Sequence, residues 1–333
     1  MSTASNPPSG EDSLIARYFK PLATDPGAFN LDDDAAALKA QGEDIVVTTD
    51  AIVEGVHYLP GDPPETIARK ALRVNLSDLA AKGATPAGFV LTLALRTVDD
   101  AWLKPFAVAL GEDAVSFACP LLGGDTVSTP GPMMISVTAF GRVPAGKMVH
   151  RSGAKPGDRV VVSGTIGDAA LGLDILKGGP AAAALAGGTA AREALIGRYR
   201  VPQPRNALAV AVRDHAHAAM DVSDGLAGDL TKLCAVSGVS AAINAAAVPL
   251  SPATAGLLKQ GAASLEALIS GGDDYEILCT IPEARFEAFE QAARQARVAV
   301  TSIGAIIAGK AAPTFLDAQG RELVLTRRSW SHF

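Results

Sequence analysis

An apolar run that ends abruptly in oxygen-bearing side chains constrains the fold of this chain more than any other feature. Residues 45–47 (Ile-Val-Val) predict a strand, and Thr48, Thr49 and Asp50 follow it directly. A second acidic run, at 32–34, lies just upstream. Hydroxyl and carboxylate oxygens gathered at a strand end are the ligands that a hard divalent cation needs. A solvated polar loop explains the stretch equally well, so the choice depends on the other motifs.

Acidic residues recur at the ends of other predicted elements and in glycine-rich turns. Asp78 falls in the last turn of a helix predicted for about 63–82, where the helix dipole disfavours a negative charge. The others are Asp34, Asp125 after two glycines, and Asp221 and Asp224 at a strand-to-helix junction. If these carboxylates converge, each pair about 4 Å apart costs roughly 4 kcal/mol at an effective dielectric constant of about 20. Divalent cations would offset that repulsion, and Mg²⁺ bound by carboxylates commonly brings phosphate groups with it.

The composition is typical of a soluble globular protein with roughly two domains. The 333 residues are 48% hydrophobic and 19% charged, with a formal net charge of −6, which argues against a nucleic-acid partner. Cys119, Cys234 and Cys279 have no C-x-x-C spacing, which indicates reduced thiols in a cytoplasmic protein. Residues 1–13 are polar, and no apolar run of 18 residues is free of glycine and charge. We therefore expect neither a signal peptide nor a membrane span.

A loop-like stretch at 147–158 divides the chain and predicts two domains, 1–146 and 147–333. Arg151 in this stretch is a candidate phosphate ligand, although a single loop arginine is more often a surface residue. The Gly- and Ala-rich segment 178–191 predicts either a mobile loop or a poorly specified helix.

The segment 221–225 (Asp-Val-Ser-Asp-Gly) leads into an amphipathic helix that is predicted to end at Gly238. Two carboxylates, the Ser223 hydroxyl and the N–H groups of a helix N-terminus together suit a polyphosphate. N-capping by Ser223 or Asp224 is the simpler interpretation, but it explains one residue and not two acids three apart.

Eight ordered motifs resemble the thiamine-monophosphate kinase family and together span nearly the whole chain. They are Asp33-Asp34-Ala35; Thr48-Thr49-Asp50 with His57; Asn75, Ser77, Asp78, Leu79 and Ala80; Gly123-Gly124-Asp125-Thr126; Arg151-Ser152-Gly153-Ala154; Asp221, Ser223, Asp224 and Gly225; Gly271-Gly272-Asp273-Asp274-Tyr275-Glu276; and the tail from Trp330 to Phe333. The resemblance implies an α/β (α+β), two-domain fold like that of aminoimidazole-ribonucleotide synthetase (PurM-like). In that fold an N-terminal α/β domain forms a barrel on dimerisation and a C-terminal α/β domain follows it, with ATP between them.

The resemblance also implies ligands for particular residues. Several Mg²⁺ ions would be held by Asp34, Thr48, Thr49, Asp50, Asp78, Asp125, Asp221 and Asp224. ATP would contact Gly124, Asp125, Arg151 and Ser223, and thiamine phosphate would contact His57, Asp273 and Trp330. Two positions depart from the family pattern. Asp32 stands where Gly is usual, and Asp273 stands where Glu is usual and reaches one methylene less toward the substrate.

These features together predict an ATP-dependent, Mg²⁺-requiring kinase that converts thiamine monophosphate to thiamine diphosphate by direct in-line transfer. No residue is expected to act as a covalent nucleophile, because the acceptor phosphate oxygen is already ionised. The rivals are a cyclo-ligase or selenophosphate synthetase of the same superfamily, and a non-catalytic sensor of thiamine phosphate or nucleotide. A selenophosphate synthetase would need a reactive Cys or selenocysteine in its N-terminal segment, and residues 1–30 contain no Cys.

The family resemblance further implies a homodimer whose N-terminal strands pair into a closed barrel. Closure removes edge strands that would otherwise invite aggregation. In the sequence itself, only the apolar strands predicted at 45–47, 88–95 and 133–140 favour this assembly.

Overall fold

The computed structural model describes residues 14–26, 28, 40, 42–187, 190–326 and 329. This part of the chain divides into two compact units. The N-terminal unit comprises Val47–Asn75, Pro86–Arg142 and the described residues before 42, and the C-terminal unit comprises Gly42–Val46, Leu76–Thr85 and the described chain from Val143 onward. Among the described residues, no helix is long and apolar enough to cross a membrane.

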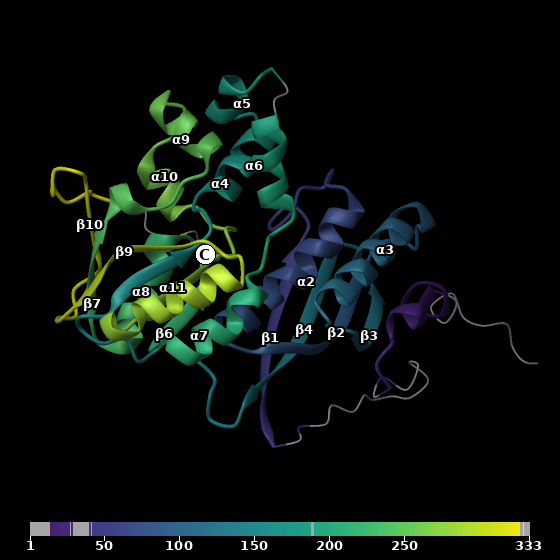
Figure 1. The fold of residues 1–333 in the computed structure, drawn as a ribbon. Helices are drawn as coiled ribbons and strands as arrows, with labels where there is room; N and C mark the ends of the chain where they lie inside the picture. Colours follow the sequence, from purple (N-terminus) through teal and green to yellow (C-terminus); the bar gives the residue numbers. More distant parts are fainter. Residues whose placement is uncertain are drawn as a thin grey trace, which may run out of the picture. The chain divides into compact units, whose positions relative to one another are not determined.

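The first half of the chain builds a four-stranded sheet. Two short helical turns, η1 (Ile15–Phe19) and η2 (Lys20–Leu22), precede β1 (Glu43–Val53), α2 (Pro64–Ala81), β2 (Thr85–Leu95), α3 (Asp100–Ser116), β3 (Leu121–Ser128) and β4 (Met134–Pro144). The strand order is β1-β4-β2-β3, and β2 and β3 run parallel. Helices α2 and α3 lie over one face of this sheet (Figure 1). Alternate residues of β4 are buried, as expected when one face of a sheet is covered.

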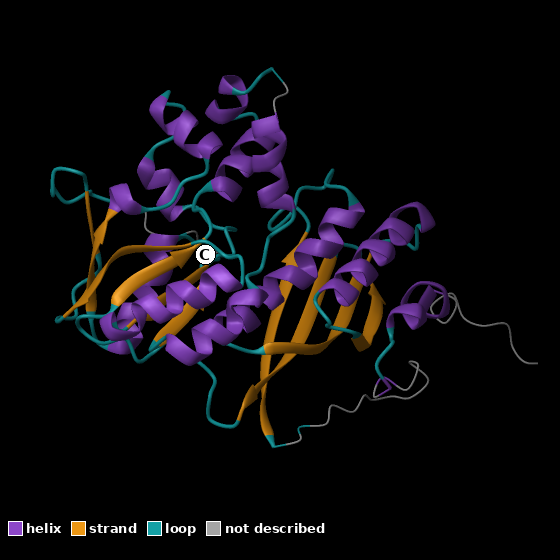
Figure 2. Cartoon of the chain, in the orientation of Figure 1, coloured by secondary structure: helices purple, strands orange, loops and turns teal. Residues whose placement is uncertain are grey.

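The C-terminal unit is built on a six-stranded sheet in the order β10-β7-β9-β5-β8-β6. Its strands are β5 (Arg159–Ser163), β6 (Ala218–Asp221), β7 (Ser240–Asn244), β8 (Ile277–Ile281), β9 (Val300–Ile307) and β10 (Thr314–Leu316). The β5–β8, β5–β9, β6–β8 and β7–β9 pairs are antiparallel, and β10 pairs with β7 in parallel. Figure 2 shows the helices of this unit around the sheet.

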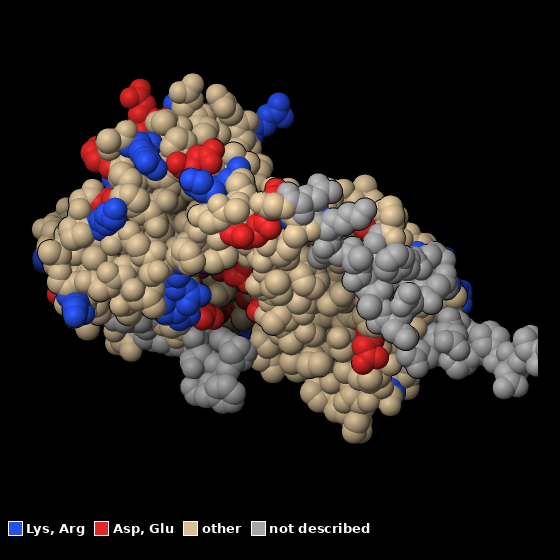
Figure 3. Space-filling view, turned by 90° about the horizontal axis from the view of Figure 1, so that it is seen from below, with Lys and Arg blue, Asp and Glu red and all other residues tan. Residues whose placement is uncertain are grey.

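On one face of the molecule, charged side chains are a minority. On the face of the molecule that Figure 3 shows, the basic and acidic side chains of the described residues lie scattered among a larger number of uncharged ones. This distribution agrees with a chain in which only 19% of the residues are charged.

The helices of the C-terminal unit fall into groups with separate cores. They are α4 (Asp168–Leu176), α5 (Pro180–Ala184), α6 (Ala190–Arg200), α7 (Ala209–His215), α8 (Leu226–Ser237), α9 (Pro252–Lys259), α10 (Leu265–Ser270) and α11 (Phe286–Gln295), with short turns η4 (Asn206–Leu208), η5 (Ala245–Ala247) and η6 (Glu283–Arg285). One core lies between α8 and the sheet, a second joins α7 and α11 to β5, β6 and β8, and a third lies among α4, α5, α6, α9 and α10.

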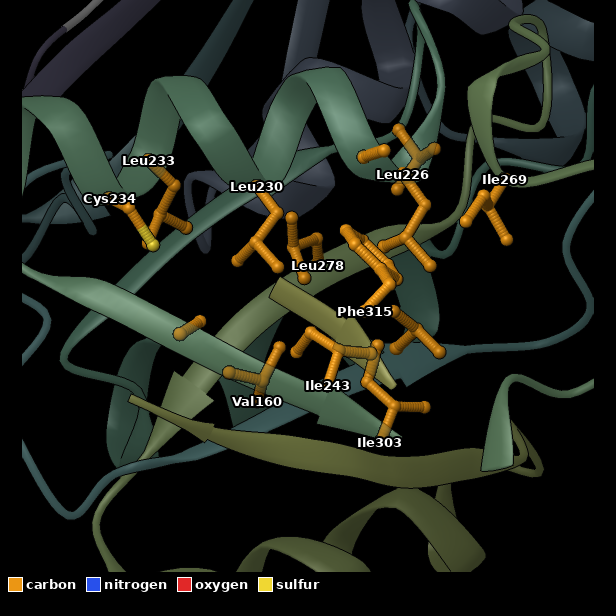
Figure 4. Close-up of a cluster of buried hydrophobic side chains, with 14 of the residues drawn as sticks. Val160, Leu226, Leu230, Leu233, Cys234, Ile243, Ile269, Leu278, Ile303 and Phe315 are labelled. Carbon is orange, nitrogen blue, oxygen red and sulfur yellow. The ribbon is translucent and has the colours of Figure 1, made fainter. Parts of the chain in front are cut away.

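Helix α8 is held by its apolar face (Figure 4). Leu226, Leu230, Leu233 and Cys234 are buried against sheet residues that include Val160, Ile243, Leu278, Ile303 and Phe315. Each fully buried side chain of this size contributes about 1.5–3 kcal/mol relative to exposure. The turn that joins β6 to α8 is therefore fixed at both ends by well-packed elements.

The sequence predicts most elements correctly. The helix expected at about 63–82 is α2, and Gly83 after it has φ +70°. Asp99 caps α3 by accepting a hydrogen bond from the Ala101 N–H. The helix expected to end at Gly238 is α8, and Gly238 adopts the left-handed conformation. The α/β (α+β) fold class is confirmed, because each half of the chain contains a β-sheet together with α-helices.

Two details of that prediction are wrong. The strand expected to end at residue 47 continues to Val53, because the β-branched residues Thr48, Thr49 and Ile52 suit a strand as well as the preceding run does. The Gly-Gly-Asp segment 123–125 is not a tight turn but lies inside β3. Hydrogen bonding to β2 outweighs the low strand propensity of glycine and aspartate there.

Candidate functional site

In β1, the predicted metal ligands Thr48, Thr49 and Asp50 lie inside the strand and not at its tip. Successive side chains of a strand point to opposite faces, so Thr48 and Asp50 share one face and Thr49 lies on the other. The Thr49 hydroxyl is 2.9 Å from that of Thr138 and 3.2 Å from the carbonyl oxygen of Val137, both in β4. If Thr48 and Thr49 held one ion together, one of them would contribute its main-chain oxygen.

His57 lies in the turn after β1, and backbone groups orient its ring. The N–H of Val53 donates to His57 Nδ1 at 3.0 Å. This hydrogen bond assigns the acceptor role to Nδ1, so the neutral ring carries its proton on Nε2. The ammonium of the buried Lys70 donates to the His57 carbonyl oxygen at 2.8 Å and stabilises the turn. The Nε2 edge of the ring is therefore the edge that can donate to an anionic group.

Gly124 and Asp125 are both exposed in β3. They lie opposite Leu91 and Thr92 of the parallel neighbour β2. A Cβ at Gly124 would be 1.9 Å from the Leu91 carbonyl oxygen, so no side chain fits there. The close approach of the β2 and β3 backbones therefore requires glycine here, and a ligand contact at Gly124 stays a prediction.

In the C-terminal unit, a half-buried cation directly after α2, Lys82, lies near predicted site residues. Asp78 is half-buried, and the Lys82 ammonium donates to the Ala219 carbonyl oxygen at 2.8 Å. Burial lowers the pKa of Lys82, and the nearby Arg151 guanidinium lowers it further. The carboxylates of Asp221 and Asp78 oppose this and raise the pKa of Lys82. Lys82 thus lies within electrostatic reach of Arg151, Asp221 and Asp78.

Arg151 is exposed, in a loop whose backbone is anchored on both sides. Before it, the Val149 N–H donates to the Lys82 carbonyl oxygen at 3.1 Å. After it, the N–H groups of Gly153 and Ala154 donate to the Ser237 hydroxyl at 3.2 and 3.3 Å. These bonds hold the arginine near the ends of α2 and α8 although its own side chain is in solvent.

The turn between β6 and α8 is organised by an acid that the sequence analysis missed. Asp221 ends β6 and is 7% exposed, whereas Asp224 is half-buried in the turn. The N–H groups of Ser223 and Asp224 donate to Oδ2 of the fully buried Asp229 at 3.1 and 2.9 Å. Asp229 therefore already accepts from the N–H groups of Ser223 and Asp224, and polyphosphate binding by the N–H groups at the start of α8 stays a prediction.

Lys232 neutralises the same turn from within α8. Its ammonium forms salt bridges with Asp224 and with Asp229, the latter at 2.9 Å. Burial raises the pKa of Asp229, and the hydrogen bond from Lys232 partly reverses that effect. Burial alone would lower the pKa of Lys232, but its hydrogen bonds with the two carboxylates outweigh it and the net shift is upward. The carboxylate of Asp224 therefore has a counter-ion inside the protein.

The loop 271–276 lies directly on this turn. The Asp273 N–H donates to the Ser223 carbonyl oxygen at 2.8 Å, and the Tyr275 N–H donates to that of Val222 at 2.8 Å. A Cβ at Gly272 would lie 2.5 Å from the Ser223 carbonyl oxygen, so the close approach requires glycine. The structure thus brings Asp221, Ser223, Asp224 and Asp273 together, which are predicted ligands from sequence positions about fifty residues apart.

Two predicted ligands, Asp34 and Trp330, lie outside the described residues, as does Asp32. The residue before Trp330 is described, and its position bears on the tail. The Ser329 hydroxyl donates to the Asp224 carbonyl oxygen at 3.4 Å. Thr326 is also tied down, because its N–H and hydroxyl donate to Glu266 at 2.5 and 2.6 Å. Ser329 therefore lies at the β6–α8 turn.

Comparisons with known proteins identify the family. The description "AIR synthase related protein, N-terminal domain" matches residues 32–143, and "AIR synthase related protein, C-terminal domain" matches 155–314. The thiamine-monophosphate kinase of Caulobacter vibrioides is 43% identical to this chain over 335 residues, covering 99% of this chain and 92% of that protein. The chain belongs to the thiamine-monophosphate kinase family. The resemblance inferred from the ordered motifs is confirmed.

Solved structures of this family share the fold. A thiamine-monophosphate kinase from Stenotrophomonas maltophilia K279a superposes with a TM-score of 0.79 at 37% identity, covering 88% of this chain and 91% of that one. A complex of AaThiL with AMPPCP and TMP superposes with a TM-score of 0.77 at 30% identity, covering 90% and 91%. The two-domain architecture expected from the motifs is therefore confirmed for this member of the thiamine-monophosphate kinase family.

The donor set in this member of the family suits a hard cation, but the described carboxylates do not form a closed cage. Carboxylate and hydroxyl oxygens are the ligands that Mg²⁺ prefers. Within the part of the chain that the structure describes, no group of three or more His, Cys, Asp or Glu side chains is placed to hold an ion. Mg²⁺ usually takes one or two carboxylates and completes its shell with water and substrate phosphates. The arrangement fits that open mode of binding.

The residues that the sequence analysis missed are mostly internal partners of the predicted ligands. Asp229 and Lys232 lie three apart on α8, a spacing that places them on one helix face and could have been read from the sequence. Lys82 follows the Asp78 motif by one helical turn. Its contact with Ala219 spans 137 residues, and no local pattern indicates a pair so distant.

Proposed function

We propose that this chain transfers the γ-phosphoryl group of ATP to thiamine monophosphate and so makes thiamine diphosphate. The observation that carries the proposal is its near-full-length similarity to thiamine-monophosphate kinases, combined with the joined loops that bring predicted nucleotide and substrate ligands together. Thiamine monophosphate is an anion with a cationic thiazolium ring, and ATP is a polyanion. A site for both substrates needs carboxylates that bind metal cations and the thiazolium ring. It also needs separate hydrogen-bond donors that bind the phosphate groups.

The roles of the residues follow this division. Mg²⁺ would be held by Asp50 and Asp125, by Asp78, Asp221 and Asp224, and by Asp34, with Thr48 and Thr49 supplying further oxygens. ATP would be bound by Gly124, Asp125, Arg151 and Ser223, and thiamine monophosphate by His57, Asp273 and Trp330. Mg²⁺ held there would neutralise the negative charge that develops on phosphate oxygens during the transfer.

The chain's own part in the reaction is binding and alignment. A terminal oxygen of the thiamine phosphate forms a bond to the γ-phosphorus while the bond from that phosphorus to the β–γ bridging oxygen breaks, and ADP leaves with the bonding electron pair. The Arg151 side chain is exposed and its loop is anchored, so its guanidinium can form hydrogen bonds and ion pairs with phosphate groups during the transfer. The Nε2–H of His57 can donate to an anionic oxygen. No side chain has to be phosphorylated for this direct transfer.

The same proposal includes an assembly and a domain division. We infer a homodimer in which the β1-β4-β2-β3 sheet closes with its counterpart into a barrel, since the open sheet otherwise leaves β1 and β3 as edges among the described strands. We also propose the domain division 1–146 and 147–333, which is supported by family matches that end at residue 143 and begin at residue 155. The reaction belongs to thiamine diphosphate biosynthesis, for which the cytoplasm is the compartment we infer.

The deciding experiment is an assay of the purified chain with ATP, Mg²⁺ and thiamine monophosphate, with both products identified by mass spectrometry. We expect equimolar thiamine diphosphate and ADP. A sensor would bind thiamine monophosphate without turnover, and a cyclo-ligase or selenophosphate synthetase would release ADP or AMP only with a different acceptor. Absence of thiamine diphosphate from a folded, substrate-saturated sample would refute the proposal.

A further inference from the structure

The loop 271–276 has an inner and an outer set of side chains. Asp274 and Glu276 are fully buried, whereas Asp273 and Tyr275 are half-buried. The Tyr275 hydroxyl is 3.3 Å from Oδ1 of Asp273, so the two outer side chains touch each other. Recognition would therefore fall to the outer pair, while the inner pair determines where the loop lies.

The backbone of this loop is strained. Asp273 has φ +71° and Tyr275 has φ +51°, both in the left-handed region. Asp tolerates that region better than most residues, but a bulky aromatic residue there is a genuine outlier. A residue in this conformation is energetically unfavourable and persists only where its surroundings enforce it. Two strained residues within three positions therefore require strong anchors.

The anchors are charged groups centred on the buried carboxylate of Glu276, which has the half-buried Arg198 and Arg205 as partners. Arg205 binds Glu276 in a bidentate manner, with Nε at 2.6 Å from one carboxylate oxygen and Nη2 on the other. Arg198 donates to the same carboxylate at 2.9 Å and to the Asp274 carbonyl oxygen at 3.0 Å. The Ser163 hydroxyl donates to Glu276 at 2.6 Å. Two guanidinium groups and a hydroxyl thus converge on one carboxylate that is 0% exposed.

The other inner residue provides a second anchor. Both carboxylate oxygens of Asp274 accept from the Gly167 N–H, at 3.0 and 2.9 Å. The fit around Glu276 is equally tight, since a Cβ at Gly164 would lie 2.1 Å from Glu276 Oε1. The side chains of Asp274 and Glu276 are therefore tightly held, and their contacts keep the backbone at Asp273 and Tyr275 in its strained conformation.

We propose that Arg198 and Arg205, acting through Glu276, are positioning residues that hold Asp273 in its strained, substrate-facing conformation. The inference rests on the proposed function, because it assigns thiamine monophosphate as the ligand of Asp273. The path is short: Glu276 is three residues from Asp273, and the intervening backbone is held to the β6–α8 turn by the N–H groups of Asp273 and Tyr275. Loosening Glu276 lets the strained residues relax and moves the Asp273 carboxylate.

Arg205→Lys is the sharpest test. Lysine keeps the positive charge but cannot form the bidentate pair. The matched control is Arg159→Lys, because Arg159 makes a bidentate pair with Glu283 at 2.5 and 2.6 Å on the surface of the same unit. A milder variant, Ser163→Ala, removes one donor to Glu276 and protects the test if Arg205→Lys folds poorly.

We expect Arg205→Lys to raise KM for thiamine monophosphate about tenfold, as loss of about 1.4 kcal/mol of charged hydrogen bonding would do, with KM for ATP changed less than about twofold. Ser163→Ala should shift KM for thiamine monophosphate in the same direction by less, and Arg159→Lys should shift neither. Equal increases for both substrates, or an unchanged KM for thiamine monophosphate together with a lower Tm, would reduce the cluster to a purely structural role and overturn the proposal.

Calorimetric titration with thiamine monophosphate separates this inference from the proposed function. If the unaltered protein binds thiamine monophosphate but does not turn it over, the kinase function fails, and weaker binding by Arg205→Lys alone still supports the positioning role. If the unaltered protein does not bind thiamine monophosphate, both proposals are refuted. If all variants bind equally, only the positioning role is refuted.

Discussion

Replacement of Gly225 by alanine tests whether the two joined loops form one functional unit. Gly225 follows Asp224 and precedes α8, with φ +109° and ψ +141°, a conformation that is essentially restricted to glycine. A Cβ there would lie 2.7 Å from the Ser270 carbonyl carbon and 2.9 Å from the Gly271 carbonyl oxygen. The substitution therefore pushes the start of the 271–276 loop away from the β6–α8 turn.

The other end of the same helix supplies the control. Gly238 has φ +68° and ψ +30°, near the ordinary left-handed minimum, and a Cβ there would have no atom within 4 Å. Gly238→Ala thus tests backbone conformation alone, at about 1–2 kcal/mol. Gly225→Ala adds overpacking of about 1–3 kcal/mol to strain of about 1–3 kcal/mol, for a central value of about 4 kcal/mol.

These free energies convert to separable melting temperatures. For a domain of about 200 residues, 1 kcal/mol corresponds to about 3 °C. We expect Gly238→Ala to lower Tm by about 3–6 °C and Gly225→Ala to lower it by about 12 °C. At a temperature where both variants are folded, kcat/KM for thiamine monophosphate should fall about 100-fold in Gly225→Ala, as an ångström-scale misplacement does, and at most a few-fold in Gly238→Ala.

Two measurements decide the matter: a thermal melt and a steady-state assay of each variant at the same temperature. Equal Tm values for the two variants would show that the close approach at Gly225 carries no energetic weight. A folded Gly225→Ala protein with the kcat/KM of the unaltered chain would refute the argument that the contact of the two loops builds the site.

Further variants and conditions test other parts of the site. Chelation of Mg²⁺ should abolish activity, and Asp221→Asn should nearly do so without unfolding the protein, as a melt would verify. Trp330→Ala should raise KM for thiamine monophosphate several-fold to about thirtyfold, because a cation–π contact is worth about 0.5–2 kcal/mol, and leave KM for ATP nearly unchanged. Arg96 lowers the pKa of Glu54 in the folded state by hydrogen bonding. The stabilisation from this pair is therefore complete above the pKa that Glu54 has in the unfolded chain, and it is lost as the pH falls through the pKa of Glu54 in the folded state. Arg96→Gln should accordingly lose less stability than the unaltered protein between neutral and acid pH, as thermal melts would measure. Lys232→Met should lower the Mg²⁺ concentration needed for half-maximal activity, measured by titration with the metal.

Local sequence predicts the elements well, because each local preference agrees with the fold. The period of α2, the cap at Asp99 and the glycine after α8 are all determined within a few residues. The end of β1 is not, because it depends on pairing with β4, which begins some eighty residues later. The division of α2 between two units, with Leu76–Thr85 in the second, is likewise a property of tertiary contacts.

In the site, as in the fold, local motifs predict some residues, while contacts between residues distant in the sequence are not predicted. Motifs predict which residues carry oxygen ligands, and in the C-terminal unit the structure brings Asp221, Asp224 and Asp273 together. What the motifs omit is the set of groups that hold those ligands in place. The Arg205–Glu276 pair joins positions 71 apart in the sequence. A buried ion pair of this kind leaves no periodic or compositional signal.

The prediction for Lys232 follows from the repulsion among the acids and from the way the chain relieves it. Converging carboxylates repel one another by roughly 4 kcal/mol for each close pair. Without other positive charges nearby, they would therefore require divalent cations. In the structure, however, the Lys232 ammonium bridges Asp224 and the buried Asp229, so part of that charge is already neutralised by the chain. Mg²⁺ at Asp224 would therefore compete with an internal cation. Lys232→Met removes the competitor while keeping most of the side-chain volume, which should tighten the metal, whereas Lys232→Arg should not. An unchanged or higher Mg²⁺ requirement in Lys232→Met would show that Lys232 orients Asp224 for the ion instead of competing with it.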